Sequence, residues 1–321
     1  MSASPLANPT ATRQMLERFG LATKHRLGQN FLIDDNVIAN ILKLAALDAG
    51  SRVLEVGPGI GTLTLGMLPH AGSVVSIEAD HELEPVLADL SHAFANFAFV
   101  MDDALKVSWE RVCEATAGAL ARAATGPGAE AGEGGAQAAE AGAQASEPNI
   151  LVANLPYNVA ATIILKYLSE HSSLAAEVVM VQAEVADRIC AEPGTKAYGA
   201  YTAKLCLYGA VTGRFEVPPT CFMPAPHVNS AVVRIERAPM VDPATGEALA
   251  PGRIERVARV IDAAFAQRRK TIRNSMSSNG FEKEALDAAF EATGIAPTYR
   301  AEVLTPEQFC ALEAALSEQE A

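Results

Sequence analysis

The chain has 321 residues, half of them hydrophobic, so it can bury a sizeable core and form two domains. No apolar run approaches the roughly 20 residues that span a bilayer, and the first ten residues lack the basic end and apolar core of a secretory signal. The five cysteines form no C-x-x-C pair, which argues against a structural zinc site and favours reduced thiols. We therefore expect a cytoplasmic protein that holds no metal, and we also expect it to be a monomer.

The formal charge of −13 does not exclude a nucleic-acid partner, because binding depends on local patches of charge. Residues 252–275 carry seven cationic side chains and two acidic ones, a local balance of +5. Such runs are often solvated faces, so the charge alone indicates a candidate surface and no more.

Short apolar stretches predict strands, and helical patterns lie between them; Val37, Ile38, Ile41, Leu42 and Leu44, for example, share one helix face. The predicted strands are 52–56, 73–78, 97–101, 150–153, 177–182 and 230–236. This alternation is typical of an α/β domain with a mostly parallel sheet, which we place within residues 1–240.

One stretch interrupts this pattern. Between residues 115 and 146, 21 of 32 residues are Ala or Gly, and none is aromatic. Such a composition buries too little apolar surface to offset ordering, so we interpret 115–148 as a flexible insertion. The part from about 113 to 124 can remain helical. Because the insertion precedes the strand at 150–153, we expect its ends near the active-site rim.

After residue 237 the pattern changes. A linker rich in Pro and Gly leads to segments that indicate only helices, so we predict a small helical domain at 250–321. Its last helix has a clear start signal, with Thr305 as the cap, Pro306 at the first helical position and Gln308 three residues after the cap.

The stretch V-L-E-V-G-P-G-I-G-T, residues 53–62, indicates a strand that ends in a tight glycine turn. Gly57 and Gly59 let the backbone approach a ligand closely. The next two predicted strands end at Glu78, a candidate for ribose hydroxyls, and near Asp103, a candidate for an adenine amine. Alone, the pattern fits a NAD site or a plain turn. Its form E-x-G-x-G-x-G, which begins at Glu55, resembles the cofactor motif of S-adenosylmethionine-dependent methyltransferases.

The strand at 150–153 leads into Asn154-Leu155-Pro156-Tyr157. Asn and Pro together are typical of a turn, which is the simplest interpretation. A second interpretation is a site that methylates an exocyclic amine. The Asn154 side-chain oxygen and the Leu155 carbonyl could accept both N–H groups, Pro156 would stiffen the turn, and Tyr157 would stack on the base.

The chain as a whole resembles the KsgA/RsmA family of ribosomal RNA adenine dimethyltransferases. The resemblance rests on K-H-R-L-G-Q-N-F-L-I-D (24–34), V-G-P-G-I-G-T-L-T (56–64), D-A-L-K-V (103–107), N-L-P-Y-N (154–158), K-A-Y-G (196–199), F-M-P-A-P-H-V-N-S-A-V (222–232) and R-R-K-T-I-R-N (268–274). It implies a Rossmann-like class I methyltransferase domain followed by a small C-terminal helical domain. It also implies dimethylation of two adjacent adenosines in a hairpin loop near the 3′ end of small-subunit (16S) rRNA, linked to small-subunit biogenesis. The partner would be that rRNA or an immature small subunit, without a membrane.

The resemblance also implies roles for single residues. Gln29, Asn30 and Leu32 would close over S-adenosylmethionine. The other expected cofactor residues are Gly57, Gly59, Glu78, Asp103 and Asn154. Asn154, Leu155, Pro156 and Tyr157 would form the catalytic turn, with Phe222 as a second aromatic wall opposite Tyr157. Contact with RNA is expected from Arg268, Arg269, Lys270 and Arg273.

The chain departs from the family in two respects: Ala183 stands where Lys is usual, and the Ala/Gly insertion is unusually long. Three alternatives stay open. The first is an enzyme that dimethylates large-subunit rRNA and gives antibiotic resistance, which the region from Phe222 to Asn274 fits less well. The second is a non-catalytic binding protein, like the related mitochondrial transcription factors. The third is a NAD-linked dehydrogenase, which N-L-P-Y disfavours.

Overall fold

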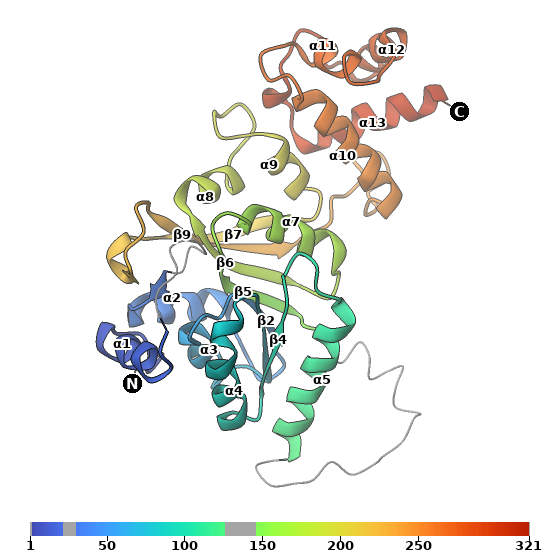
Figure 1. The fold of residues 1–321 in the computed structure, drawn as a ribbon. Coiled ribbons are helices and arrows are strands. Elements are labelled where there is room, and N and C mark those ends of the chain that lie inside the picture. The colour runs from blue at the N-terminus through green and yellow to red at the C-terminus, as the bar shows by residue number, and fades with distance from the viewer. Residues whose placement is uncertain (1, 22–29, 126–145, 321) are drawn as a thin grey trace, which may run out of the picture. The chain divides into compact units, whose positions relative to one another are not determined.

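The computed structural model describes residues 2–21, 30–125 and 146–320 (Figure 1), and its internal contacts divide the chain into two compact units. The first holds Met1–Ala186 and Thr212–Glu236, and the second holds Asp187–Val211 and Arg237–Ala321. The division differs from the predicted boundary at 240–250, because the second unit also takes 187–211. That segment includes a short helix, α9 (Ala200–Leu205), which packs against α10 (Pro251–Phe265).

A seven-stranded sheet has the order β4-β3-β2-β5-β6-β9-β7. Five strands run parallel to their neighbours, and β9 runs antiparallel to β6. The bounds are β2 Arg52–Val56, β3 Ser73–Glu78, β4 Phe97–Met101, β5 Ile150–Asn154, β6 Ala176–Gln182, β7 Gly209–Val217 and β9 Ser230–Arg237. The predicted α/β fold is confirmed, and β2, β3 and β4 have the predicted bounds. The sequence did not predict β7, nor the short pair β1 (Phe31–Leu32) and β8 (Phe222–Met223).

Helices connect these strands. They are α1 Pro9–Arg18, α2 Asp35–Ala45, α3 Thr62–Met67, α4 Glu84–Ala93, α5 Trp109–Thr125, α7 Ala160–Glu170 and α8 Ala183–Ile189. The chain moves outward from β2 through β3 to β4 and then returns to β5 on the other side of β2. In open parallel sheets, ligands bind at the carboxyl ends of the strands where the order reverses, so the crevice is expected between β2 and β5.

The described ends of the insertion lie at the opposite, amino-terminal edge of the sheet. Helix α5 runs back along the sheet (Figure 1), and near its end Arg122 donates to the carbonyl of Phe97, the first residue of β4, at 2.6 Å. On the return, Asn149 exchanges hydrogen bonds of 2.8 and 2.9 Å with Arg52, the first residue of β2. The expectation that the insertion ends near the active-site rim is therefore wrong. The predicted helix at 113–124 is confirmed, whereas the flexible part, 126–145, lies outside the described residues.

The second unit has its own hydrophobic core, which includes Tyr198, Phe265, Phe290 and Phe309. Its remaining helices are α11 (Ile272–Ser277), α12 (Lys283–Thr293) and α13 (Pro306–Glu320). The predicted start of α13 is confirmed as a capping box. The Thr305 N–H donates to Gln308 Oε1 at 2.9 Å, and the Gln308 N–H donates to Thr305 Oγ1 at 3.3 Å.

None of the described helices is long and apolar enough to cross a bilayer.

Candidate active site

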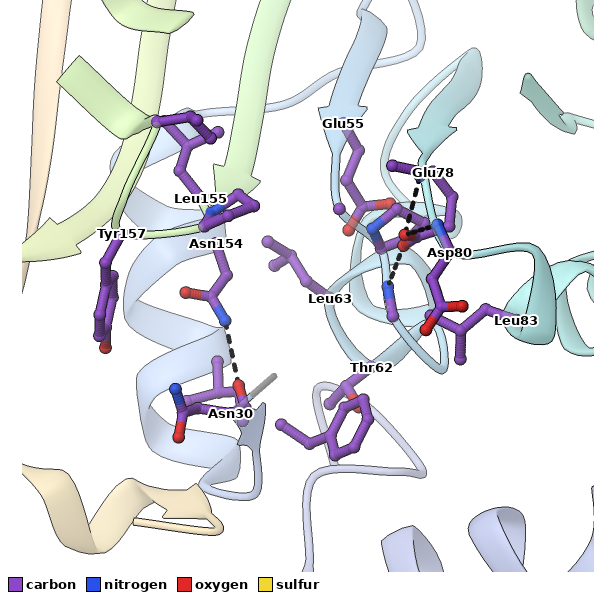
Figure 2. A pocket seen from close by; sticks show the side chains of 18 of the residues that line it. Asn30, Glu55, Thr62, Leu63, Glu78, Asp80, Leu83, Asn154, Leu155 and Tyr157 are labelled. Atoms are coloured by element: carbon purple, nitrogen blue, oxygen red, sulfur yellow. Dashed lines mark hydrogen bonds between the residues drawn. The ribbon is translucent and has the colours of Figure 1, made fainter. Parts of the chain in front are cut away.

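A cavity of about 360 Å³ opens at the carboxyl ends of β2, β3, β4 and β5 (Figure 2), a size typical of pockets for small molecules. The fold brings together ten of the residues that the sequence predicted for the site, although they are spread over more than 120 positions. They are Asn30, Leu32, Gly57, Gly59, Glu78, Asp103, Asn154, Leu155, Pro156 and Tyr157. Gln29 lies outside the described residues.

The glycine turn after β2 forms the floor of the cavity. Gly57 and Gly59 have φ angles of 70° and 60°, a left-handed conformation that side chains disfavour. A Cβ atom on Gly59 would also lie 3.1 Å from the ring of Phe31. The turn therefore exposes bare backbone to the cavity, so a ligand can approach it closely.

Glu78 ends β3 and is only 8% exposed. Its Oε1 accepts the N–H groups of Ala79 and Asp80, both at 2.9 Å, and its Oε2 accepts the Gly59 N–H at 3.3 Å (Figure 2). Burial raises the pKa of Glu78 above its ordinary value, and the three N–H donors oppose that rise. The carboxylate is thus held in one orientation at the cavity wall.

Glu55, in β2, also lines the cavity and is 1% exposed. Its Oε2 accepts hydrogen bonds from the hydroxyls of Thr64 at 2.6 Å and Ser76 at 2.7 Å. Burial raises the pKa of Glu55 to about 7, against the two hydroxyl donors, and the nearby Glu78 charge adds to the rise. From the sequence, Glu55 was recognised only as the first residue of the glycine motif. The signal that it also lines the site was an acidic residue within an otherwise apolar strand.

Asp103 lies beyond β4 in a tight turn. Its Oδ1 accepts the Leu105 N–H at 2.9 Å, and Lys106 Nζ lies 3.3 Å from its Oδ2. The backbone hydrogen bond, and then Lys106, hold the pKa of Asp103 below its ordinary value, so the group is ionised at neutral pH. The buried Tyr167 hydroxyl stabilises this turn by donating to the Ala104 carbonyl at 2.9 Å.

Asn154 is the last residue of β5, and its side chain reaches into the other half of the cavity. Its Nδ2 donates to the carbonyl of Asn30 at 3.4 Å (Figure 2), which leaves Oδ1 as the acceptor on the side of Tyr157. The next residue is fixed to the sheet, because the Leu155 N–H donates to the Met180 carbonyl of β6 at 3.1 Å. The turn therefore presents one amide oxygen beside one aromatic ring.

The two predicted aromatic walls differ in position. Tyr157 lines the cavity, and its hydroxyl lies 2.6 Å from the Ser230 hydroxyl. Phe222 is 3% exposed, belongs to the hydrophobic core and pairs in β8 with Leu32 of β1. It is not among the described residues that line the cavity, so a wall opposite Tyr157 would require its ring to move.

The four predicted RNA-binding residues lie in the second unit and fall into two groups. Arg273 forms a two-point ion pair with Asp287 at 2.5 and 2.6 Å. Arg268 donates to the carbonyls of Lys196 and Tyr198 at 3.3 and 3.2 Å. Arg269 and Lys270 are exposed. The structure thus holds Arg268 and Arg273 by bonds within the second unit, although Arg268, like Arg269 and Lys270, is exposed.

Ala183, where the resemblance to the family implies Lys, is the first residue of α8, and its N–H donates to the Asn229 carbonyl at 2.9 Å. Among the described residues, no group of three or more His, Cys, Asp or Glu side chains could hold a metal ion.

Comparison with known proteins gives consistent matches. A family model described as ribosomal RNA adenine dimethylase matches residues 20–318. A protein named ribosomal RNA small subunit methyltransferase A from Magnetococcus marinus is 37% identical over 300 residues, 93% of each chain. A protein of the same name from Cutibacterium acnes is 38% identical over 316 residues, 95% of this chain and 92% of that one.

Two solved structures resemble the chain. A dimethyladenosine transferase from Plasmodium falciparum superposes with a TM-score of 0.66 at 19% identity, over 90% of this chain and 98% of that one. The 23S rRNA methyltransferase ErmE superposes with a TM-score of 0.60 at 23% identity, over 90% of this chain and all of that one. At these identities the two structures show the shared methyltransferase fold alone.

Proposed function

Because the chain belongs to the family of ribosomal RNA adenine dimethylases, we propose that it dimethylates the N6 amines of two adjacent adenosines in small-subunit rRNA. The two adenosines would lie in a hairpin loop near the 3′ end of the 16S rRNA, and the reaction would serve small-subunit biogenesis. The observation that carries the proposal is the joining of the glycine turn and the N-L-P-Y turn in one cavity.

The residues of the cavity fit S-adenosylmethionine, the methyl donor of this enzyme class. The methionine part could lie against the backbone of Gly57 and Gly59, which line the cavity in a left-handed conformation that only glycine adopts readily. The Glu78 carboxylate is held ready to accept the two ribose hydroxyls, and Asp103 can accept the adenine amine. When bound, the donor supplies an electrophilic methyl group on a sulfonium, so no general base is needed at the start.

The N-L-P-Y turn would activate the target amine by position. The lone pair of an adenine N6 is delocalised into the ring, so it attacks poorly while the amine is planar. Acceptors at Asn154 Oδ1 and the Leu155 carbonyl would bind both N–H groups and favour a pyramidal nitrogen whose lone pair points at the methyl group. Tyr157 would stack on the base and hold its plane. Catalysis is then mostly orientation and electrostatics.

We further propose that the exposed Arg269 and Lys270 contact phosphates of the RNA, while Arg268 and Arg273 chiefly stabilise the second unit. Phosphate contacts supply affinity that does not depend on sequence, and they require cations that remain accessible. Arg268 is exposed too, but its bonds to two carbonyls, like the ion pair of Arg273, hold the side chain within the second unit.

The main alternative is the same chemistry on large-subunit rRNA. The fold does not separate the two substrates, because ErmE and a dimethyladenosine transferase both superpose on the chain. The names of the relatives at 37% and 38% identity favour the small subunit. We propose the cytoplasm as the site of action because ribosomal RNA is the expected substrate. A monomer remains our prediction, which light scattering of the purified protein would test.

The decisive experiment is methyl transfer from labelled S-adenosylmethionine to small subunits from cells that lack this modification, with large-subunit RNA as the comparison. Nucleoside analysis of the product should show N6,N6-dimethyladenosine in small-subunit RNA alone. Label only in large-subunit RNA would replace the proposed substrate. Cofactor binding without any transfer would indicate an assembly factor that has kept its cavity.

A further inference from the structure

The contact between Tyr157 and Ser230 joins two parts of the chain that are 73 residues apart. The two hydroxyl oxygens lie 2.6 Å apart, a short hydrogen bond for two neutral groups. Ser230 is fully buried, so water cannot readily replace Tyr157 as its partner. Burial raises the pKa of Tyr157 above its ordinary value, so its phenol keeps its proton at neutral pH.

The topology explains how a distant serine reaches the cavity. Strand β9 runs antiparallel to β6, and Ser230, its first residue, lies opposite Gln182, the last residue of β6. The start of β9 is therefore at the carboxyl edge of the parallel strands, where the N-L-P-Y turn leaves β5. Tyr157 is thus attached to the sheet at two points, by its own backbone beyond β5 and by its hydroxyl to β9.

A ring attached at both ends differs from one attached only through Cβ. A free tyrosine side chain rotates about two bonds, and stacking on a base would have to stop that rotation. Here the hydroxyl bond restricts the ring before any base arrives. The Asn154 amide oxygen lies on the side of Tyr157 (Figure 2), so the plane of the ring sets where a stacked adenine would present its amine.

We propose that Ser230 is a positioning residue for methyl transfer: its hydroxyl anchors the Tyr157 ring in the plane that brings the adenine amine to Asn154. The inference rests on the proposed function of the cavity. Ser230 itself lies outside the cavity lining and acts only through Tyr157.

The first test is Ser230→Ala. Loss of one hydrogen bond and of the restriction on the ring should lower kcat with the rRNA substrate about 3- to 10-fold. The dissociation constant of S-adenosylmethionine by calorimetry should stay within twofold, since the anchor lies on the side of the base. Tyr157→Phe should cause a similar loss of kcat, because it removes the same bond and keeps the ring.

The double variant Tyr157→Phe/Ser230→Ala separates positioning from stability. Tyr157→Phe leaves the buried Ser230 hydroxyl without its partner, and Ser230→Ala does the same to the hydroxyl of the half-buried Tyr157, so each should lower Tm. The double variant removes both hydroxyls and should recover most of that loss. A positioning role requires kcat to remain low in the double variant. Recovery of kcat together with Tm would reduce the bond to a structural contact and overturn the proposal.

Ser91→Ala is the matched control. It removes a half-buried serine hydroxyl bonded to the Phe97 carbonyl at 3.3 Å, far from the cavity. It should keep full kcat. Full kcat in Ser230→Ala as well would also overturn the proposal.

A binding measurement distinguishes failure of the proposed function from failure of the proposed role of Ser230. An RNA hairpin with 2-aminopurine at the target position reports stacking by fluorescence quenching. If the wild type transfers no methyl group, the proposed function fails, yet stronger quenching by the wild type than by Ser230→Ala would still support the anchor. Equal quenching by both proteins would overturn it, whether or not transfer occurs.

Discussion

The two halves of the cavity are held in different ways. On the cofactor half, the Glu78 carboxylate accepts three backbone N–H groups, and the Asp103 carboxylate is held by a backbone N–H and by Lys106. On the chemical half, the described contacts are fewer: Asn154 donates once, at 3.4 Å, and the Tyr157 hydroxyl has Ser230.

The difference indicates two tasks. The cofactor is the same in every turnover, so its partners can be fixed by the backbone. The acceptors for the target amine must remain available until the base arrives, because a hydrogen bond to the protein would compete with the one that activates the substrate. Variants on the two halves should therefore affect different constants.

Asn154→Ala should have the largest effect. It removes an acceptor for the amine and should lower kcat at least about a hundredfold, the scale of one lost transition-state contact. The cofactor dissociation constant should change no more than a few fold. Single-turnover methyl transfer and calorimetry measure the two quantities. Asn40→Ala, an exposed change in α2, is the control. Near-normal turnover in Asn154→Ala would remove Asn154 from the chemistry.

The pH dependence of stability tests how much the buried Glu55 carboxyl, on the cofactor half of the cavity, lowers the free energy of unfolding. Its pKa is about 7 in the folded protein against an ordinary 4.5, so between these values the folded state binds the extra proton. Stability must then fall as pH rises through this window, by an amount on the order of 3 kcal/mol at pH 8. Glu55→Gln stays neutral and should lack this slope.

Melting temperatures of the wild type and Glu55→Gln between pH 5 and pH 8 check this prediction. The melting temperature of Glu55→Gln should increase relative to that of the wild type as pH rises. Parallel curves would show that Glu55 does not change its protonation in the folded protein over this range.

Glu78→Gln should act on binding. It replaces a fixed carboxylate that accepts the ribose hydroxyls, and hydrogen bonds to charged groups are worth about 1.5–3 kcal/mol, or roughly 10- to 100-fold in affinity. Calorimetry with S-adenosylmethionine measures the change, and the exposed Glu82→Gln serves as control. Unchanged affinity would contradict the ribose role of Glu78.

The sequence predicted the cofactor half better than its surroundings, for a physical reason. Strands β2, β3 and β4 are short apolar runs, and each ends in polar or glycine residues that must lie at one edge of a parallel sheet. In these three strands, the local residue pattern and the position in the fold therefore indicate the same structure. Strand β7 was missed for two reasons. Along most of its length exposed residues alternate with half-buried ones, and it contains two glycines, which weaken a strand signal.

The sequence could not predict contacts between residues that are far apart in the chain. The F-x-P-x-P motif marks Phe222 as important but cannot tell on which side of the short strand β8 its ring lies, and the structure buries it in the core. Nothing near Tyr157 points to Ser230. The ends of the insertion were placed at the wrong edge because the length of α5 was overlooked: 17 residues at about 1.5 Å each carry the chain back across the sheet.

A smaller effect is expected on RNA capture, which involves neither half of the cavity. The double change Arg269→Ala/Lys270→Ala should weaken RNA binding about tenfold and reduce the slope of log affinity against log salt by about two. Arg273→Ala should instead lower Tm, because it leaves Asp287 unpaired, and should keep the salt slope. Filter binding over a salt series measures both. An unchanged slope in the double variant would place the RNA elsewhere.

The smallest effect should come from replacing residues 126–145 with a ten-residue Gly-Ser linker. The described ends of the insertion lie at the amino-terminal edge of the sheet, opposite the cavity, so kcat and cofactor affinity should not change. Halving a flexible loop changes its closure free energy by only about 0.6 kcal/mol, so Tm should move by less than about 3 °C. A larger fall in Tm would show that the segment packs on the domain. A loss of methyl transfer at constant Tm would show that it takes part in substrate binding, in spite of where its ends lie.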